Sequence, residues 1–149
     1  MPCSIGWNTS SQGKWIVENL GPTLEVEGYS YLKLMILDDQ RPLIPKWPRE
    51  IFEYGHGKGS QYVSGVGVHW YVDDLGLAFA LDQFHEEFPD KFILYTEACN
   101  IPTQWNPNQV ALGDWNRGEK YFSDIIENLN HWAVGWTDWN IALDLQGMQ

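Results

Sequence analysis

The chain has 149 residues, which suits one domain and is too short for two. Its 9 basic and 20 acidic side chains give a net charge of −11, which excludes the basic surface that a nucleic-acid partner requires. Aromatic residues make up 15% of the chain, with nine tryptophans, and such side chains serve both as core and as stacking walls for sugar rings.

Neither the cysteines nor the first residues indicate a disulfide scaffold or a membrane protein. Cys3 and Cys99 lie far apart and lack the spacing of a metal site. No signal peptide is predicted after Met1, because a positive start and a long apolar core are both lacking, and no apolar run reaches the length of a membrane span. Asn8 begins an Asn-Thr-Ser sequon, which is meaningful only in a secreted protein.

The hydrophobic pattern predicts helices and strands in alternation. The first helix is expected to begin at Ser10 or Ser11 and to end at Gly21-Pro22. A strand is expected at 31–37, followed abruptly by Asp38. The later elements, in chain order, are an irregular proline-rich stretch at 41–48, a short helix at 48–54, a loop at 55–59, a strand at 63–68, a helix capped by Asp73 or Asp74, a strand at 92–95, a loop at 100–108, a long helix, a strand at 133–136 and a tail at 141–149.

Two of the predicted helices carry apolar residues on one face, as is typical of helices that bury that face. These residues are Leu77, Leu81, Phe84 and Phe88 in the helix before the third strand, and Tyr121, Ile125, Leu129 and Trp132 in the long helix.

The alternation of helices with four strands predicts an α/β fold with a parallel sheet and right-handed crossovers. The strands begin near Tyr31, Val63, Phe92 and Ala133. Four strands do not close a (β/α)₈ barrel, which needs roughly 250 residues. The chain is therefore expected to be either a small open α/β domain or a piece of a barrel.

Each predicted strand ends in polar or aromatic side chains. The endings are Asp38-Asp39-Gln40, His69-Trp70-Tyr71, Glu97 and Asp138-Trp139-Asn140. Parallel strands bring their carboxyl ends to one rim, where the ligands and catalytic groups of α/β proteins lie, so a shared pocket is predicted there. Glu97 is the strongest candidate for a functional side chain, because a carboxylate beside a buried strand is costly unless it is paired or used.

Three chemistries could use such a rim. The first is metal binding, as in metal-dependent barrel hydrolases, by Asp38, His69, Glu97 and Asp138. The second is attack by Cys99 with His69 or His131 as base, although a buried structural cysteine is the commoner case. The third is glycoside hydrolysis with Glu97 as nucleophile, which agrees best with the aromatic content. Retention then needs a second carboxylate at about 5–5.5 Å, and the candidates are Asp38, Asp39 and Asp138.

Five blocks of the sequence occur together in one known family. They are Asn19-Leu20-Gly21-Pro22-Thr23-Leu24, Leu37-Asp38-Asp39-Gln40-Arg41, Val68-His69-Trp70-Tyr71, Glu97-Ala98-Cys99 and Gly135-Trp136-Thr137-Asp138-Trp139-Asn140. In this order, across nearly the whole chain, they resemble the lysosomal glucosylceramidases of glycoside hydrolase family 30. The resemblance implies a (β/α)₈ TIM barrel and a retaining β-glucosidase that hydrolyses glucosylceramide to glucose and ceramide.

The resemblance also implies roles for single residues. Glu97 stands at the position of the family's catalytic nucleophile. Four residues stand at positions that line the family's glucose pocket: Gln40, His69, Tyr71 and Trp139. Trp70 and Asp138 lie beside these positions and are expected to support the site, whereas Cys99 matches a family cysteine that is not catalytic. The family uses neither a metal nor another cofactor.

The chain also departs from the family pattern. The family's acid/base glutamate lies in an Asn-Glu-Pro motif, and this tripeptide does not occur here. Residues 1–149 are therefore expected to be an internal fragment with the last four strands of an incomplete TIM barrel, inactive alone. A sugar- or lipid-binding fragment without activity and a metal-dependent hydrolase remain alternatives. The resemblance implies a β-glucoside substrate, an anionic lipid surface and a saposin-type activator as partners, and a location in the lysosomal lumen.

Overall fold

A computed structural model describes residues 6–99 and 113–139. The predicted loop at 100–108 and tail at 141–149, together with Cys3 and Asn140, lie outside the described residues. Four strands form one parallel sheet in sequence order: β1 (Leu34–Gln40), β2 (Val63–His69), β3 (Phe92–Glu97) and β4 (Ala133–Trp136). The predicted parallel sheet is confirmed.

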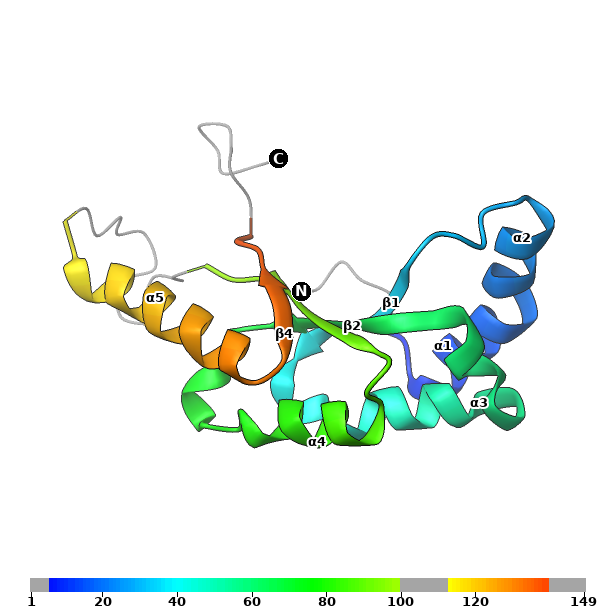
Figure 1. The fold of residues 1–149 in the computed structure, drawn as a ribbon, viewed down its shortest axis with the longest axis horizontal. Coiled ribbons are helices and arrows are strands. Elements are labelled where there is room, and N and C mark those ends of the chain that lie inside the picture. Colours follow the sequence, from blue (N-terminus) through cyan, green and yellow to red (C-terminus); the bar gives the residue numbers. More distant parts are fainter. Residues whose placement is uncertain (1–5, 100–112, 140–149) are drawn as a thin grey trace.

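Helices cover one face of the sheet, with α3 (Lys46–Tyr62) and α4 (Phe79–Glu87) lying along it (Figure 1). The core between these layers includes Ile51, Phe52, Val66, Val68, Leu81, Phe84, Ile93 and Tyr95. The helices bury one face of the sheet. The opposite face and the carboxyl ends of the strands therefore remain available for a functional site. Across the two described ranges, no helix has the length and apolar character needed to cross a bilayer.

The first helical segment is longer than predicted. α1 (Thr9–Trp15) continues through a π-helical turn (Ile16–Leu20) into α2 (Gly21–Val26), and Asn8, not Ser10 or Ser11, caps it. Pro22 lies in the first turn of α2, where a missing N–H costs little. Gly21 does not end the helix, because its role is packing: a Cβ there would meet the Tyr62 ring at 2.4 Å.

Strand β1 lies three residues later than predicted. Asp38, Asp39 and Gln40 belong to the strand, whereas Tyr31 lies outside it and is 71% exposed. A bulge allows the strand to continue past Leu37 to Gln40. Leu37 and Asp38 have φ angles of +73° and +54°, and the register with β2 shifts between Leu37 and Asp39. Hydrophobicity alone does not mark such a bulge.

Helix α3 begins at Lys46, inside the stretch that was predicted to be irregular, and its backbone leaves helical geometry only at 54–57. The predicted loop at 55–59 is therefore partly right. Gly55 and Gly57 supply positive φ angles at this kink. Gly59 is helical, and a Cβ there would lie 1.9 Å from the carbonyl oxygen of Ile51. Glycine thus permits both the kink and the close approach of the two helical parts.

Helix α4 keeps the predicted face, since Leu81 and Phe84 are fully buried and Leu77 and Phe88 are partly buried. The predicted cap is wrong, because Ala78 precedes the helix and Asp73 belongs to a separate short 3₁₀ turn. Asp73 forms a buried ion pair with Arg41 instead.

Helix α5 (Trp115–Asn130) keeps the predicted apolar face only in part, since Tyr121 and Ile125 are partly buried and Tyr121 packs against the core. Its buried residues are Asp124 and Asn128, at 9% and 0% exposure, while Leu129 and Trp132 are 50% and 53% exposed. Trp132 lies beyond the helix end and stacks on His85, with 3.8 Å between the ring centroids. The inward face of the helix therefore carries a polar stripe, Asp124 and Asn128, beside the partly buried apolar residues.

That polar stripe binds the fully buried guanidinium of Arg41. The Arg41 cluster consists of this side chain, its partners Tyr95, Asp73, Glu127 and Asn128, and Asp124, which is bonded to Asn128. Arg41 Nε donates to the Tyr95 hydroxyl (2.9 Å), and Nη2 donates to Asp73 and to Asn128 Oδ1 (2.6 Å). Both terminal nitrogens lie 3.2 Å from Glu127 Oε2. Asp124 accepts from Asn128 and from the Trp136 indole, so the cluster joins the 3₁₀ turn after β1 (Arg41–Leu43) to β3, β4 and α5.

We expect stability to rise on acidification because of Asp73. Burial raises the pKa of Asp73 to about 7, with the Arg41 charge opposing this rise and the Asp124 charge supporting it. The folded state thus binds this proton more tightly than an unfolded aspartate of pKa about 3.9. Its contribution is complete below about pH 4 and is lost as the pH rises through about 7.

The measurement is the Tm of thermal unfolding between about pH 4 and 8, the range in which this group titrates. Asp73→Asn should reduce the slope of Tm against pH, although it also lowers Tm by weakening the pair with Arg41. Asp74→Asn is the matched control, because Asp74 is 79% exposed and should leave the slope unchanged. An unchanged slope in Asp73→Asn would contradict this prediction.

Candidate active site

Glu97 is the last residue of β3, and its side chain is 15% exposed. Its Oε1 accepts a hydrogen bond of 2.9 Å from the Tyr71 hydroxyl. Its Oε2 lies 3.6 Å from His69 Nε2. The register of β2 and β3 pairs His69 with Glu97, which is why two residues distant in sequence meet here. Each carboxylate oxygen therefore has a neighbouring side chain, and the partial exposure leaves the group accessible to a ligand.

Tyr71 is poised to donate to this carboxylate. Burial raises its pKa well above the usual range, and its hydrogen bonds with Cys99 and Glu97 add to the rise. The phenol therefore keeps its proton, and the Glu97 carboxylate accepts it as a hydrogen bond. Without this hydroxyl, one oxygen of Glu97 would lose its donor and the carboxylate could rotate.

His69 lies between two carboxylates. Its Nε2 is 3.2 Å from Asp38 Oδ1 and 3.6 Å from Glu97 Oε2. Burial works to lower the pKa of His69, but the hydrogen bond to Asp38 and the charges of Glu97, Asp38 and Asp39 outweigh it, so the pKa is raised. The imidazolium form is favoured at this rim.

Gln40 ends β1 and pairs in register with His69. Its Oε1 is buried and accepts no hydrogen bond from any of the described residues. Buried amide oxygens are rarely left without a donor, so this atom is suited to a hydroxyl of a ligand.

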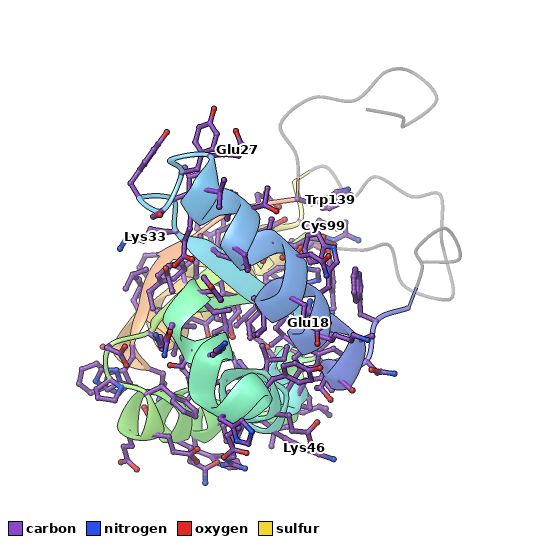
Figure 2. All side chains as sticks on the ribbon, turned by 90° about the vertical axis from the view of Figure 1, so that its right-hand side faces the viewer. Glu18, Glu27, Lys33, Lys46, Cys99 and Trp139 are labelled. Carbon is purple, nitrogen blue, oxygen red and sulfur yellow. The ribbon has the colours of Figure 1, made fainter. Side chains whose placement is uncertain are left out.

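Trp139 follows β4 and is 39% exposed. Its backbone N–H donates to Ala98 O at 2.7 Å, so the tryptophan is fixed beside the residue that follows Glu97. Figure 2 shows Trp139 and Cys99 side by side at this end of the sheet. The structure thus brings Gln40, His69, Tyr71, Glu97 and Trp139 to the carboxyl ends of β1 to β4.

The cysteine dyad that the sequence left open is not assembled. Cys99 Sγ lies 3.5 Å from the Tyr71 hydroxyl, while its carbonyl accepts from the Trp70 indole. His131 bonds Asp82 on α4, and His69 Nε2 faces carboxylates. Neither histidine is therefore placed as a base for the thiol.

Two of the acidic residues at the rim have other partners. Asp138 Oδ1 accepts from the Trp139 N–H and the Tyr121 hydroxyl. The hydrogen bond to His69 lowers the pKa of Asp38, and a group that is ionised in this way does not suit a general acid. Among residues 6–99 and 113–139, no three His, Cys, Asp or Glu side chains are grouped so as to hold a metal ion.

The sequence offered Asp38 as a metal ligand or as the second carboxylate of a retaining glycosidase, but not as a partner of His69. The structure places it in contact with His69 and Thr96. Trp70 is 3% exposed and stacks on Tyr121 at 4.7 Å, so it supports the site from within the core. The signal for Asp38 was its place in the Asp-Asp-Gln ending of β1.

A carboxylate held at the carboxyl end of a parallel strand, with polar and aromatic neighbours on adjoining strands, is the arrangement in which TIM-barrel enzymes build their active sites. A model of the glycosyl hydrolase family 30 TIM-barrel domain matches residues 2–149. The chain belongs to this family. The predicted incomplete TIM barrel is thereby confirmed.

Two relatives with assigned names agree with this family assignment. The chain is 41% identical over 145 residues to putative glucosylceramidase 4 of Caenorhabditis elegans, covering 97% of this chain and 27% of that protein. It is 39% identical over 144 residues to lysosomal acid glucosylceramidase of Mus musculus, covering 96% and 27%. The chain thus spans about a quarter of the length of these relatives.

Two solved structures share the fold. SrfJ from Salmonella typhimurium superimposes with a TM-score of 0.75 at 22% identity, over 90% of this chain and 28% of that one. An endo-β1,6-glucanase superimposes with a TM-score of 0.69 at 25% identity, over 92% and 29%. The fold of this chain thus matches a part of each of these longer chains.

Proposed function

We propose that the protein that carries this chain is a retaining β-glucosidase in which Glu97 is the nucleophile. The observation that carries the proposal is the hold on Glu97, with one oxygen bonded to Tyr71 and the other facing His69. Two fixed partners pre-organise a carboxylate for attack, which lowers the reorganisation needed in the transition state.

In the first step a Glu97 oxygen bonds to the anomeric carbon while the bond from that carbon to the leaving oxygen breaks. The leaving oxygen takes the bonding electron pair and a proton from a second carboxylic acid. In the second step that group, now a base, removes a proton from water, whose oxygen displaces Glu97. The products are the free sugar and the aglycone alcohol.

The remaining rim residues would bind the sugar. Gln40 Oε1 offers an unpaired acceptor for a hydroxyl. Trp139 presents a partly exposed indole as a wall for a sugar ring. His69 and Tyr71 flank the carboxylate and would contact hydroxyls beside the anomeric carbon.

The acid/base group is proposed to lie outside these 149 residues, which form one partial barrel domain. The Asn-Glu-Pro motif expected by family resemblance is missing from the sequence. Since a general acid contributes about 10²–10⁴-fold, the 149-residue chain alone should be nearly inactive.

Glucosylceramide is the substrate we propose, with glucose and ceramide as products and a role in sphingolipid breakdown. Support comes from the names of the relatives, which are glucosylceramidases, and one of them is lysosomal. On the same ground we propose a lysosomal location in contact with an anionic lipid surface, and a saposin-type activator as partner.

The test is covalent trapping. A 2-deoxy-2-fluoro-β-glucoside with a good leaving group should inactivate the complete protein, and peptide mass spectrometry should find the sugar ester on Glu97. The 149-residue chain, assayed in parallel on a fluorogenic β-glucoside, should turn over at least about 100-fold more slowly. A label on another residue would refute the assignment, and strong turnover by the short chain would refute an external acid/base group.

A further inference from the structure

Asp38 occupies an unusual place in β1. The bulge gives it no partner in the register, which pairs Leu37 with Gly67 and Asp39 with Val68. Its φ of +54° is uncommon for a residue other than glycine. Bulges of this kind occur near active sites, where they redirect a side chain. Here the redirected side chain is a carboxylate that is 64% exposed.

Two neighbouring strands hold that carboxylate. The Thr96 hydroxyl of β3 donates to Asp38 Oδ1 at 2.7 Å, and His69 Nε2 of β2 lies 3.2 Å from the same oxygen. Gly67 keeps the space open, because a Cβ there would come within 3.1 Å of both Asp38 Oδ1 and Thr96. Three strands thus contribute to one contact.

His69 Nε2 is shared between Asp38 at 3.2 Å and Glu97 Oε2 at 3.6 Å. The hydrogen bond from His69 lowers the pKa of Asp38, and the same bond helps to raise the pKa of His69 against the effect of burial. The other groups that face His69 are Asp39 on β1 and the Tyr71 ring, whose centroid lies 6.1 Å away. The pair is therefore ionic, with its positive end turned toward Glu97.

We propose that Asp38 is a positioning residue of the glycosidase site, which keeps His69 cationic and aims its Nε2–H between Asp38 and Glu97. This inference rests on the proposed function. When Glu97 becomes a sugar ester it loses its negative charge, and Asp38 then remains as the counter-ion of His69. The nucleophile can thus gain and lose charge beside a histidine whose own charge stays balanced.

The experiment compares Asp38→Asn, Asp38→Glu and Asp39→Asn in the complete protein. Asp38→Asn keeps the size of the side chain and removes its charge, so the pKa of His69 should fall, and the alkaline limb of kcat/KM should move about one pH unit lower. At a pH on that limb kcat should drop about tenfold, with KM nearly unchanged. Asp38→Glu should restore the limb, and Asp39→Asn should move it less than Asp38→Asn does, because Asp39 acts on His69 through its charge alone and makes no hydrogen bond to it.

NMR titration of His69 in the same variants measures the ion pair without turnover. An unshifted His69 titration in Asp38→Asn, or a shifted titration with an unchanged pH profile, would overturn the positioning role. Equal losses in Asp38→Asn and Asp38→Glu would also overturn it, since they indicate packing of the bulge only. Turnover that persists in Glu97→Gln would instead refute the proposed function, so the two failures are distinguishable.

Discussion

Glu97→Gln in the complete protein is expected to lower kcat by on the order of 10⁴-fold or more while the fold is kept. Glutamine has nearly the same shape and can still accept a hydrogen bond from Tyr71. The contact of 2.9 Å between the two side chains should therefore be kept. An amide oxygen carries no full negative charge and forms no stable ester with the anomeric carbon. The loss should therefore appear in kcat and not in the Tm.

The control is Glu53→Gln, an isosteric change on an exposed position of α3, which should leave kcat within about twofold, as is usual for surface substitutions. A second variant, Glu97→Ala, makes room for azide as a substitute nucleophile. Azide would attack the anomeric carbon from the side on which residue 97 lies, so a β-glucoside should yield the α-glucosyl azide. Retention of more than about one per cent of kcat in Glu97→Gln would rule out a nucleophilic role, given the expected size of the effect.

Arg41→Met is expected to cost about 3–5 kcal/mol of unfolding free energy, which is the usual effect of removing one partner from a buried ion pair. Methionine fills part of the space but donates no hydrogen bond. Asp73 and Asn128 would lose their donor in a region where the Arg41 side chain is 0% exposed. For a chain of this size the change corresponds to a fall in Tm of roughly 10 °C.

Arg49→Met is the matched control. Arg49 also pairs with a carboxylate, that of Glu87 at 2.6 Å, but the two side chains are 42% and 36% exposed. Water and salt screen a pair as exposed as this one, so the same substitution should lower Tm by only a few degrees. If calorimetry in one buffer shows the same fall in Tm for both substitutions, burial of the Arg41 cluster does not decide how much the cluster stabilises the fold.

The rim could be anticipated from the sequence because strand ends are a local signal. Short apolar runs mark β2, β3 and β4, and parallel pairing brings their last residues together. The positions of His69, Tyr71 and Glu97 follow from this rule almost without further information. Their roles came from family resemblance, since a strand end by itself does not distinguish a nucleophile from a solvated carboxylate.

The bulge in β1 and the buried face of α5 could not be anticipated in this way. Periodicity assumed that apolar residues of α5 face inward, yet Asp124 and Asn128 do so. The reason is a partner 87 residues away in sequence, because Asn128 accepts from Arg41. A polar helix face looks solvated until the buried cation that it binds is known.

The sequence by itself determined the alternation of helices and strands, the parallel sheet and the rim that carries Glu97, since each depends on patterns within a few residues. Only the tertiary structure decided what those side chains contact. The pairing of Asp38 with His69, the hold on Glu97 and the burial of Arg41 join residues from different strands and helices. Such contacts depend on register, bulges and packing, which are properties of the whole sheet and not of any one segment.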